Sequence, residues 1–222
     1  IYTLSLHDAL PISIHAVTGG RLRQRARCRA FCTLAISDVI GDSPAAIGSG
    51  PSVADPSTFQ ECIAIVELYE LREALPRTVI EHLERGVAGL IAETPKQASG
   101  LFHESQYRIV ASNRISIDAA ARAARERGCS VEVLTTEMQG HTHEAAHRFA
   151  AALGHAASGP RNDAPIVLLA GGETTLAVQG NGKGGRNQEF ALVAACDLQG
   201  LDNVVLLSAG SDGMNRDRKS VV

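Results

Sequence analysis

The residues best suited to chemistry lie in one glycine-rich stretch, GGETTLAVQGNGKGGRNQEFAL, from Gly171 to Leu192. Six glycines fall within its first fifteen residues, with Glu173 and Lys183 among them and Arg186 directly after. Glycine costs backbone entropy, so a stretch that keeps this many brings its backbone close to another group. Consecutive backbone N–H groups at the start of a helix, beside Lys183 and Arg186, predict a cradle for an anion.

The same stretch also fits a dinucleotide-binding pattern. Gly180, Gly182 and Gly185 satisfy G-x-G-x-x-G, after a predicted strand at 174–179 and before a predicted helix. The acidic residue that would meet a ribose should close the following strand, and Asp202 precedes that strand instead. The pattern therefore stays a minor alternative, beside a simple glycine-rich hairpin turn.

A second motif, HEAAH, runs from His143 to His147 and matches the zinc-protease pattern H-E-x-x-H. That pattern sets two imidazoles one helical turn apart, with a glutamate able to act as a base. Ala150 and Leu153 stand where an extended zinc motif has glycine and a third histidine. Because the segment lies in an alanine-rich amphipathic helix, the two histidines can simply share a solvated face.

Aspartates follow two of the predicted strands. Asp38, Asp42 and Asp55 lie in the loop after the first strand, and Asp212 lies in the later loop SAGSDG. Carboxylates at strand ends suit Mg²⁺, which takes one or two of them together with substrate phosphates. An Asx turn or a helix cap is an equally good interpretation of Asp55, which precedes Pro56.

Strands and helices alternate along the chain. The patterns predict strands at 31–37, 107–112, 130–135, 166–170 and 203–210, and helices at 57–71, 76–86, 113–128, 142–153 and 187–198. Ser57 or Thr58 should cap the first of these helices and Asn113 the third. This alternation predicts parallel pairing in an α/β fold, with ligands at the carboxyl ends of the strands. Three loops qualify there: 38–55, 171–175 and 209–213.

Composition narrows the class of protein. The chain has 222 residues, 45% hydrophobic and 20% charged, and a net charge of −3. This balance gives no reason to expect nucleic acid or an anionic membrane as a partner, and the basic segment at 21–29 is expected to be solvated. Five cysteines without a CxxC pair, no apolar run of about 20 residues and no signal-peptide pattern favour a cytoplasmic protein.

Seven motifs in order resemble the family of glycerate 2-kinases with a C-terminal MOFRL domain, some of which are labelled hydroxypyruvate reductase. The motifs span about 13–215 and are GGRL (19–22), SDVIGD (37–42), GSGPSVADP (48–56), ETPK (93–96), GGETT (171–175), GGRNQEFAL (184–192) and SDG (211–213). The resemblance implies ATP- and Mg²⁺-dependent phosphorylation of D-glycerate at its 2-hydroxyl, which gives 2-phosphoglycerate.

The resemblance also implies an architecture and a set of site residues. An incomplete Rossmann-like domain with a parallel sheet would span 13–158, the first part of a MOFRL α/β domain 159–215, and the active site the cleft between them. Arg186 is the leading catalytic candidate and Asp212 the second, with Asp38 and Asp42 as metal candidates. Substrate or nucleotide binding is expected of Gly171, Gly172, Glu173, Thr174, Lys183, Gly184, Gly185, Asn187, Ser49 and Gly50.

The chain departs from the family pattern in three places. The family's N-terminal segment with a functional lysine and the end of its MOFRL domain do not appear, and GHTHE stands at 140–144 where the family has GEARE. Residues 1–12 and 216–222 are expected to be foreign to the protein, so turnover is expected of the intact parent. An NAD(P)H-dependent hydroxypyruvate reductase, a non-catalytic phospho-ligand module and a homo-oligomer stay open.

Overall fold

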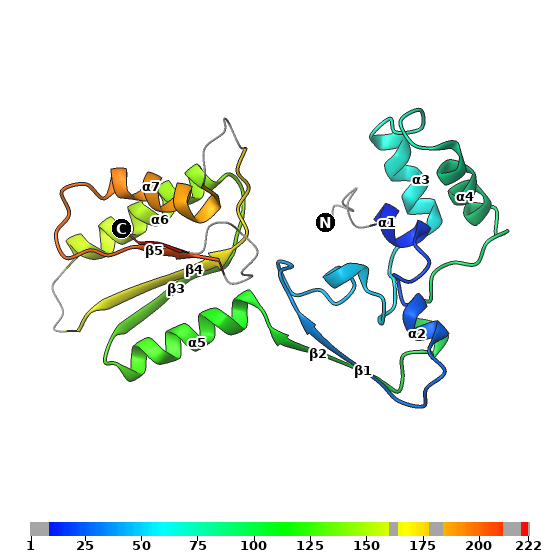
Figure 1. Cartoon of the computed structure of the whole chain (residues 1–222), viewed down its shortest axis with the longest axis horizontal. Coiled ribbons are helices and arrows are strands. Elements are labelled where there is room, and N and C mark those ends of the chain that lie inside the picture. Colours follow the sequence, from blue (N-terminus) through cyan, green and yellow to red (C-terminus); the bar gives the residue numbers. More distant parts are fainter. Residues whose placement is uncertain (1–8, 160–163, 178–183, 211–218, 222) are drawn as a thin grey trace. The chain divides into compact units, whose positions relative to one another are not determined.

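The computed structural model describes residues 9–159, 164–177, 184–210 and 219–221 (Figure 1). The first half contains α1 (Ala9–Ile14), α2 (Arg21–Arg25), β1 (Phe31–Ile36), the 3-10 helix η1 (Ile47–Ser49), α3 (Phe59–Leu68), α4 (Arg77–Val87), the 3-10 helix η2 (Gln97–Ser99) and β2 (Ser105–Ala111). The second half contains α5 (Asn113–Glu126), β3 (Ser130–Met138), α6 (Thr142–Ser158), β4 (Ile166–Gly172), α7 (Arg186–Asp197), β5 (Leu207–Ala209) and β6 (Lys219–Val221). None of the described helices is long and apolar enough to cross a membrane.

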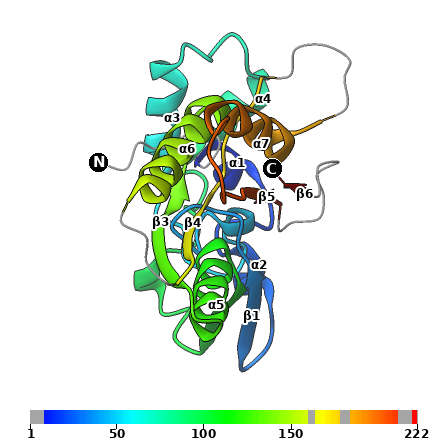
Figure 2. The same cartoon turned by 90° about the vertical axis from the view of Figure 1, so that its left-hand side faces the viewer.

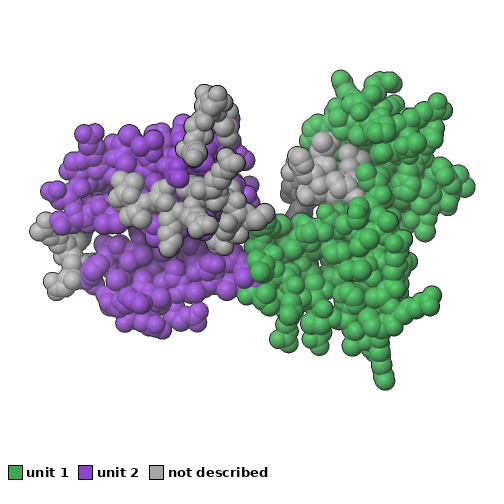
Figure 3. Space-filling model, viewed as in Figure 1, with its two compact units in different colours: residues 1–110 green, residues 111–222 purple. Residues whose placement is uncertain are grey.

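The chain forms two compact units, residues 1–110 and residues 111–222 (Figure 3). This division follows packing within the chain. Helix α5, strand β3 and helix α6 therefore pack with the later elements of the chain rather than with the earlier ones. The domain boundary expected between 158 and 159 stays a prediction.

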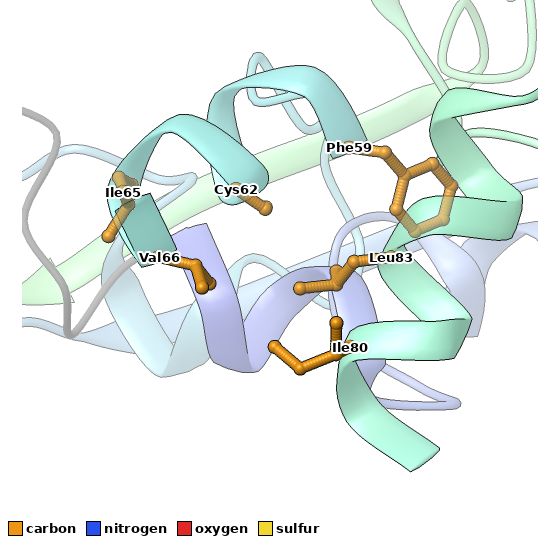
Figure 4. Packing of buried hydrophobic residues seen from close by; sticks show 6 residues of the cluster. All are labelled: Phe59, Cys62, Ile65, Val66, Ile80 and Leu83. Atoms are coloured by element: carbon orange, nitrogen blue, oxygen red, sulfur yellow. The ribbon is translucent and has the colours of Figure 1, made fainter. Parts of the chain in front are cut away.

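The core of the first unit lies between α3 and α4. Helix α3 begins at Thr58 with a capping box, in which the Thr58 side chain accepts from Glu61 N and the Glu61 carboxylate accepts from Thr58 N at 2.8 Å. Apolar residues recur at helical spacing on both helices, so each presents one stripe to the other. Figure 4 shows the buried cluster that results: Phe59, Cys62, Ile65, Val66, Ile80 and Leu83.

The sheet of the first unit is only half covered. Strands β1 and β2 are hydrogen-bonded neighbours in a two-stranded sheet. Ala35 in β1 is buried, whereas its neighbours Leu34 and Ile36 are 66% and 74% exposed. The strand predicted at 31–37 forms as β1, but period-2 alternation turns Leu34 and Ile36 away from the core.

In the second unit, β3 and β4 pair in parallel, from Ser130 opposite Ile166 to Met138 opposite Gly172. Helix α5 lies on one side of this pair, and α6 and α7 pack together on the other (Figures 1 and 2). The α6–α7 contact is built on the buried alanines Ala146, Ala150, Ala191 and Ala194, which let two helix backbones approach closely. Leu206, just before β5, completes the buried cluster. The predicted α/β class and parallel pairing are confirmed, while β5 and β6 pair antiparallel.

Several predicted boundaries need correction. Ser112 caps α5 through its side chain, and Asn113 is the first helical residue. Helix α6 continues to Ser158 instead of ending near residue 153. The predicted strand at 203–210 is reduced to β5, and Asn203 at its expected start adopts a left-handed backbone with φ of 62°.

The basic segment at 21–29 is not simply solvated. The Arg21 guanidinium donates to the carbonyls of Ile12 at 3.0 Å and His15 at 2.7 Å. Arg23 is 8% exposed, and its Nε donates to Ser105 Oγ at 2.8 Å. These two arginines therefore tie α2 to neighbouring chain segments, which the charge pattern alone did not predict.

Candidate functional site

Arg186, the leading catalytic candidate, is the first residue of α7. Its Nη1 donates to Glu173 Oε1 at 2.6 Å and to the Thr174 carbonyl at 3.1 Å. The side chains of Arg186 and Glu173 are 31% and 50% exposed, so the guanidinium is oriented by the protein and still meets solvent. An arginine held this way can face an anionic ligand with its planar fork.

The glycines before Glu173 are required by close packing. A Cβ at Gly171 would lie 2.1 Å from Asn113 Oδ1, and a Cβ at Gly172 would lie 2.2 Å from the Met138 carbonyl oxygen. Gly172 also has φ of 153°, which favours glycine. Both glycines belong to the end of β4 rather than to the predicted loop, and they let β4 approach β3 and α5. The Glu173 amide then donates to the Met138 carbonyl at 2.9 Å, which sets where the Glu173 side chain starts.

Thr174 is held by the start of α6. Thr142, the first residue of that helix and fully buried, donates from Oγ1 to the Thr175 carbonyl at 2.9 Å. The same hydroxyl lies 3.0 Å from Thr174 Oγ1, and since it has one proton, Thr174 is the donor in that contact. Thr175 N also donates to the Gly140 carbonyl at 2.9 Å. The loop after β4 is therefore held by the segment around the start of α6, and its Glu173 and Thr174 were both predicted as site residues.

The start of α7 gathers three further predicted residues. Gly185 is the N-cap residue of this twelve-residue helix and has no capping side chain, and Gly184 precedes it. Asn187 Oδ1 accepts from Ser208 Oγ in β5 at 2.8 Å, which ties the first turn of the helix to the sheet. The first turn of a helix favours negative charge through its unpaired N–H groups, so the arrangement suits an anion beside Arg186.

The HEAAH histidines have carboxylate partners. His143 Nε2 lies 2.6 Å from Glu189 Oε1, and His147 Nδ1 lies 2.6 Å from Asp197 Oδ2, so both pairs connect α6 with α7. Across the residues that the structure describes, no group of three or more histidines, cysteines or carboxylates could hold a metal ion. The described geometry gives these histidines a structural role and lends no support to a zinc site.

In the first unit, Ser49 ends η1 and Gly50 is its C-cap residue. Gly48, Ser49 and Gly50 have φ of 56°, 60° and 55°, a left-handed run that costs about 1–2 kcal/mol at the non-glycine Ser49. The carbonyls of Ser49 and Gly50 are occupied: Gly19 N donates to Ser49 O at 2.9 Å and Gly20 N to Gly50 O at 2.8 Å. The motifs GGRL and GSGP are therefore in direct contact, which spacing along the sequence did not predict.

The metal candidates lie in the same unit. Asp38 follows β1 and is exposed, and Asp42 is partly exposed in a turn where its amide donates to the Val39 carbonyl at 3.1 Å. Asp42 has φ of 53°, a conformation that aspartate tolerates better than most residues. Their assignment as magnesium ligands stays a prediction.

Two predicted site residues, Lys183 and Asp212, lie outside the described residues, as do Gly180 and Gly182 of the dinucleotide pattern. Thr174–Ala177, the described part of that pattern's expected strand, makes only a single bridge, between Thr175 and His141. The described residues 174–177 therefore do not form the strand that the dinucleotide pattern requires before its glycines.

Neither of the two hollows described next is lined by a predicted site residue. The first, of about 360 Å³, is lined by side chains that include Arg21, Arg25, His82 and Glu93. The second, of about 510 Å³, is lined by side chains that include Leu134, Met138, Arg148 and Phe149. The predicted residues that the structure describes lie instead at the end of β4, at the end of η1, in loops and at the start of α7.

Comparison with known proteins finds a family match within each of the two units. Residues 12–84 match the model of a domain of unknown function, DUF4147, and residues 166–219 match the MOFRL family. The glycerate 2-kinase of Pyrococcus horikoshii is 38% identical over 204 residues, which are 90% of this chain and 46% of the relative. The D-glycerate 2-kinase of Thermotoga maritima is 34% identical over 200 residues, 89% of this chain and 44% of the relative.

Solved structures agree with these matches. The crystal structure of a glycerate kinase from Thermotoga maritima has a TM-score of 0.73 at 32% identity, covering 90% of this chain and 45% of that one. A protein from Pyrococcus horikoshii has a TM-score of 0.68 at 37% identity, with the same coverage. The chain thus spans about half the length of the relatives it matches. Two ordered family matches, the sequence identity and the shared fold agree: the chain belongs to the glycerate 2-kinase family with a MOFRL segment.

Proposed function

We propose that the chain is part of an ATP-dependent kinase that phosphorylates D-glycerate at its 2-hydroxyl and releases 2-phosphoglycerate. The observation that carries this proposal is Arg186, placed at the start of α7 and held by Glu173 and the Thr174 carbonyl. Phosphoryl transfer is mostly positioning and charge stabilisation, and an oriented arginine at a helix start supplies both. The kinases among the relatives support glycerate as the acceptor.

Arg186 would act on either of two anions. Its guanidinium could stabilise the phosphoryl group in transfer, or it could bind the carboxylate of glycerate through two parallel hydrogen bonds. The ion pair with Glu173 fixes the side chain in one orientation before the ligand arrives, which reduces the entropy lost on binding. Asn187, Thr174 and the glycines at 184–185 would line the same site, and Lys183 would add positive charge.

Magnesium would accompany the nucleotide phosphates. Asp38 and Asp42 fit this use because Mg²⁺ needs only one or two protein carboxylates when phosphates complete its coordination. Asp38 is exposed just after β1 and Asp42 is partly exposed in the turn that follows, so both carboxylates are accessible for that purpose, and no third acidic ligand is required. Asp212 would bind the same ion or orient the attacking hydroxyl. We further propose that these residues and the Arg186 group face each other across the interdomain cleft of the intact enzyme.

The test is turnover by the intact parent protein with ATP, Mg²⁺ and D-glycerate, with 2-phosphoglycerate measured directly. Arg186→Ala should lower kcat by about 10²- to 10³-fold. Its half-exposed ion pair contributes at most about 1 kcal/mol to stability, so the variant should remain folded. Arg127→Ala is the matched control, because this exposed arginine is the C-cap residue of α5 and, among the described residues, its guanidinium donates only to the Ala123 carbonyl.

One relative supports a second candidate function. A protein of Agrobacterium vitis, provisionally named as a hydroxypyruvate reductase, is 35% identical over 216 residues, 96% of this chain and 54% of the relative. A reductase would oxidise NADH with hydroxypyruvate and would need no ATP. Oxidation of NADH with hydroxypyruvate and without ATP by the intact parent protein would refute the kinase proposal for this site. Near-normal kinetics in Arg186→Ala would refute it as well.

A further inference from the structure

A buried carboxylate lies at the centre of the first unit's polar contacts. Asp55 is 2% exposed. Its Oδ1 accepts from Ser57 N at 2.9 Å and Ser57 Oγ at 2.7 Å, and its Oδ2 accepts from Thr94 Oγ1 at 2.7 Å. The first bond is the predicted Asx turn. A carboxylate this deeply buried is tolerated only with such donors, so its position is tightly specified.

Lys96 completes the network from the side of the ETPK motif. Its ammonium donates to Thr94 Oγ1 at 2.8 Å and to the Ser57 carbonyl. Thr94 Oγ1 therefore accepts from Lys96 while it donates to Asp55, and the two bonds polarise each other. Glu93 Oε2 lies 3.5 Å from the Lys96 ammonium. The lysine side chain is one-third exposed, so its charge is partly solvated.

The network lies directly against the Gly19–Gly20 turn. A Cβ on Gly19 would lie 3.2 Å from Asp55 Oδ2 and 3.1 Å from Thr94 Cγ2, so the backbone of this turn is in contact with both side chains. On its other side, the turn donates two backbone hydrogen bonds to the carbonyls of Ser49 and Gly50. The glycine turn is thus held between the polar network and the left-handed loop.

We propose that Lys96 is a positioning residue. By fixing Thr94 and Asp55 it holds the Gly19–Gly20 turn in place, and through the hydrogen bonds of that turn it fixes the position of the Ser49–Gly50 loop. The loop is strained at Ser49, so it needs contacts that hold it in one conformation. The value of this positioning for catalysis rests on the proposed function, in which Ser49 and Gly50 bind substrate or nucleotide.

The experiment measures hydrogen exchange of individual backbone amides in the 222-residue chain. Lys96→Met keeps the aliphatic stem and removes both donated bonds. We expect the Gly19 and Gly20 amides to exchange at least about tenfold faster, because the bonds they donate open more often, while Leu83 in the α3–α4 core is unchanged. Lys96→Arg should restore most of the protection. Arg77→Met is the control, since Arg77 is 91% exposed and pairs only with Glu81 among the described residues.

Unchanged exchange at both glycines would overturn the proposal. Equal acceleration at Leu83 would also overturn it, because the network would then stabilise the whole unit rather than position the turn. Thr94→Val is the second variant, and it should reproduce the local effect by removing the intermediate hydroxyl. If neither Lys96→Met nor Thr94→Val folds, the positioning role is refuted in favour of a general structural one.

A binding measurement separates this inference from the function on which it rests. Calorimetry of the intact parent protein with D-glycerate and with ATP should show affinity weakened at least about tenfold in Lys96→Met for one of the two ligands. Locally faster exchange without any ligand binding by the wild-type protein would refute the proposed function and leave the coupling itself intact. Faster exchange with unchanged affinity for both ligands would refute the role of this loop in binding.

Discussion

Gly86 in α4 offers a sharp test of the packing in the first unit. A Cβ at this position would lie 2.3 Å from Phe59 Cγ, 2.4 Å from Cδ2 and 2.6 Å from Cδ1. These atoms are at the base of a ring that is 1% exposed, so the ring cannot swing away as the far end of a flexible side chain could. Gly86→Ala should therefore destabilise the protein, even though it lies within a helix.

The magnitude follows from two opposing effects. Replacing glycine by alanine inside a helix stabilises it by up to about 1 kcal/mol. Forcing one methyl group into a filled core costs roughly 1–3 kcal/mol, with the larger values where neighbours cannot move. The 2.3 and 2.4 Å contacts with Phe59 are much shorter than any that real Cβ atoms make, so the cost belongs to the upper part of that range. We expect Gly86→Ala to lower the free energy of unfolding by about 1–2 kcal/mol.

The matched control is Gly154 in α6. A Cβ there would meet only Leu201 Cδ1, at 3.6 Å, which is an ordinary van der Waals contact. Gly154→Ala should raise the free energy of unfolding by up to about 1 kcal/mol, so the same substitution has opposite signs in the two helices. Urea unfolding followed by circular dichroism measures both. A Gly86→Ala variant as stable as the wild type would show that Phe59 does not pack against α4 as described.

Two further predictions concern the same unit. Thr58→Ala removes the side-chain acceptor for Glu61 N and should lower the free energy of unfolding by about 1 kcal/mol, measured in the same urea experiment; no change would contradict the capping box. Burial raises the pKa of the Cys62 thiol, so iodoacetamide should modify this thiol in the native protein far more slowly than the exposed thiols. The free energy of unfolding should also decline once the pH passes the ordinary thiol pKa, because the thiol ionises first in the unfolded chain. Mass spectrometry after limited alkylation checks the rate of modification, and early labelling of Cys62 would contradict its burial; the exposed thiols are Cys28, Cys32 and Cys196.

Local patterns predicted most elements because their signals are local. Helix α3 has its cap and its apolar spacing within one short segment, and β4 is a compact apolar run. The predictions were wrong where two neighbouring residues can make the same hydrogen bond and only a distant contact decides between them. Ser112 and Asn113 can both cap a helix, and Ser112 takes the cap while Asn113 Nδ2 donates to the Thr136 carbonyl on β3 at 2.5 Å. That contact lies 23 residues away, so no local pattern contains it.

The candidate site divides in the same way. The sequence predicted Arg186 and Glu173 from their motifs, and the structure brings them together, 2.6 Å apart. No sequence pattern indicated Thr142 or Ser208, whose hydroxyls contact the site residues from α6 and β5. Single hydroxyl residues have no distinctive spacing, so only their partners in the folded chain reveal what they do.

By itself, the sequence determined the α/β alternation, the family and the residue types of the proposed site, because hydrophobic periodicity and short motifs are encoded locally. Only the tertiary structure shows the close contacts that require glycine at positions 171 and 172. It also shows the partners of Arg21 and Arg23, and the contacts that bring GGRL, GSGP and ETPK together around Asp55. Each of these depends on atoms far apart in the chain coming within a few ångströms, and that proximity is a property of packing.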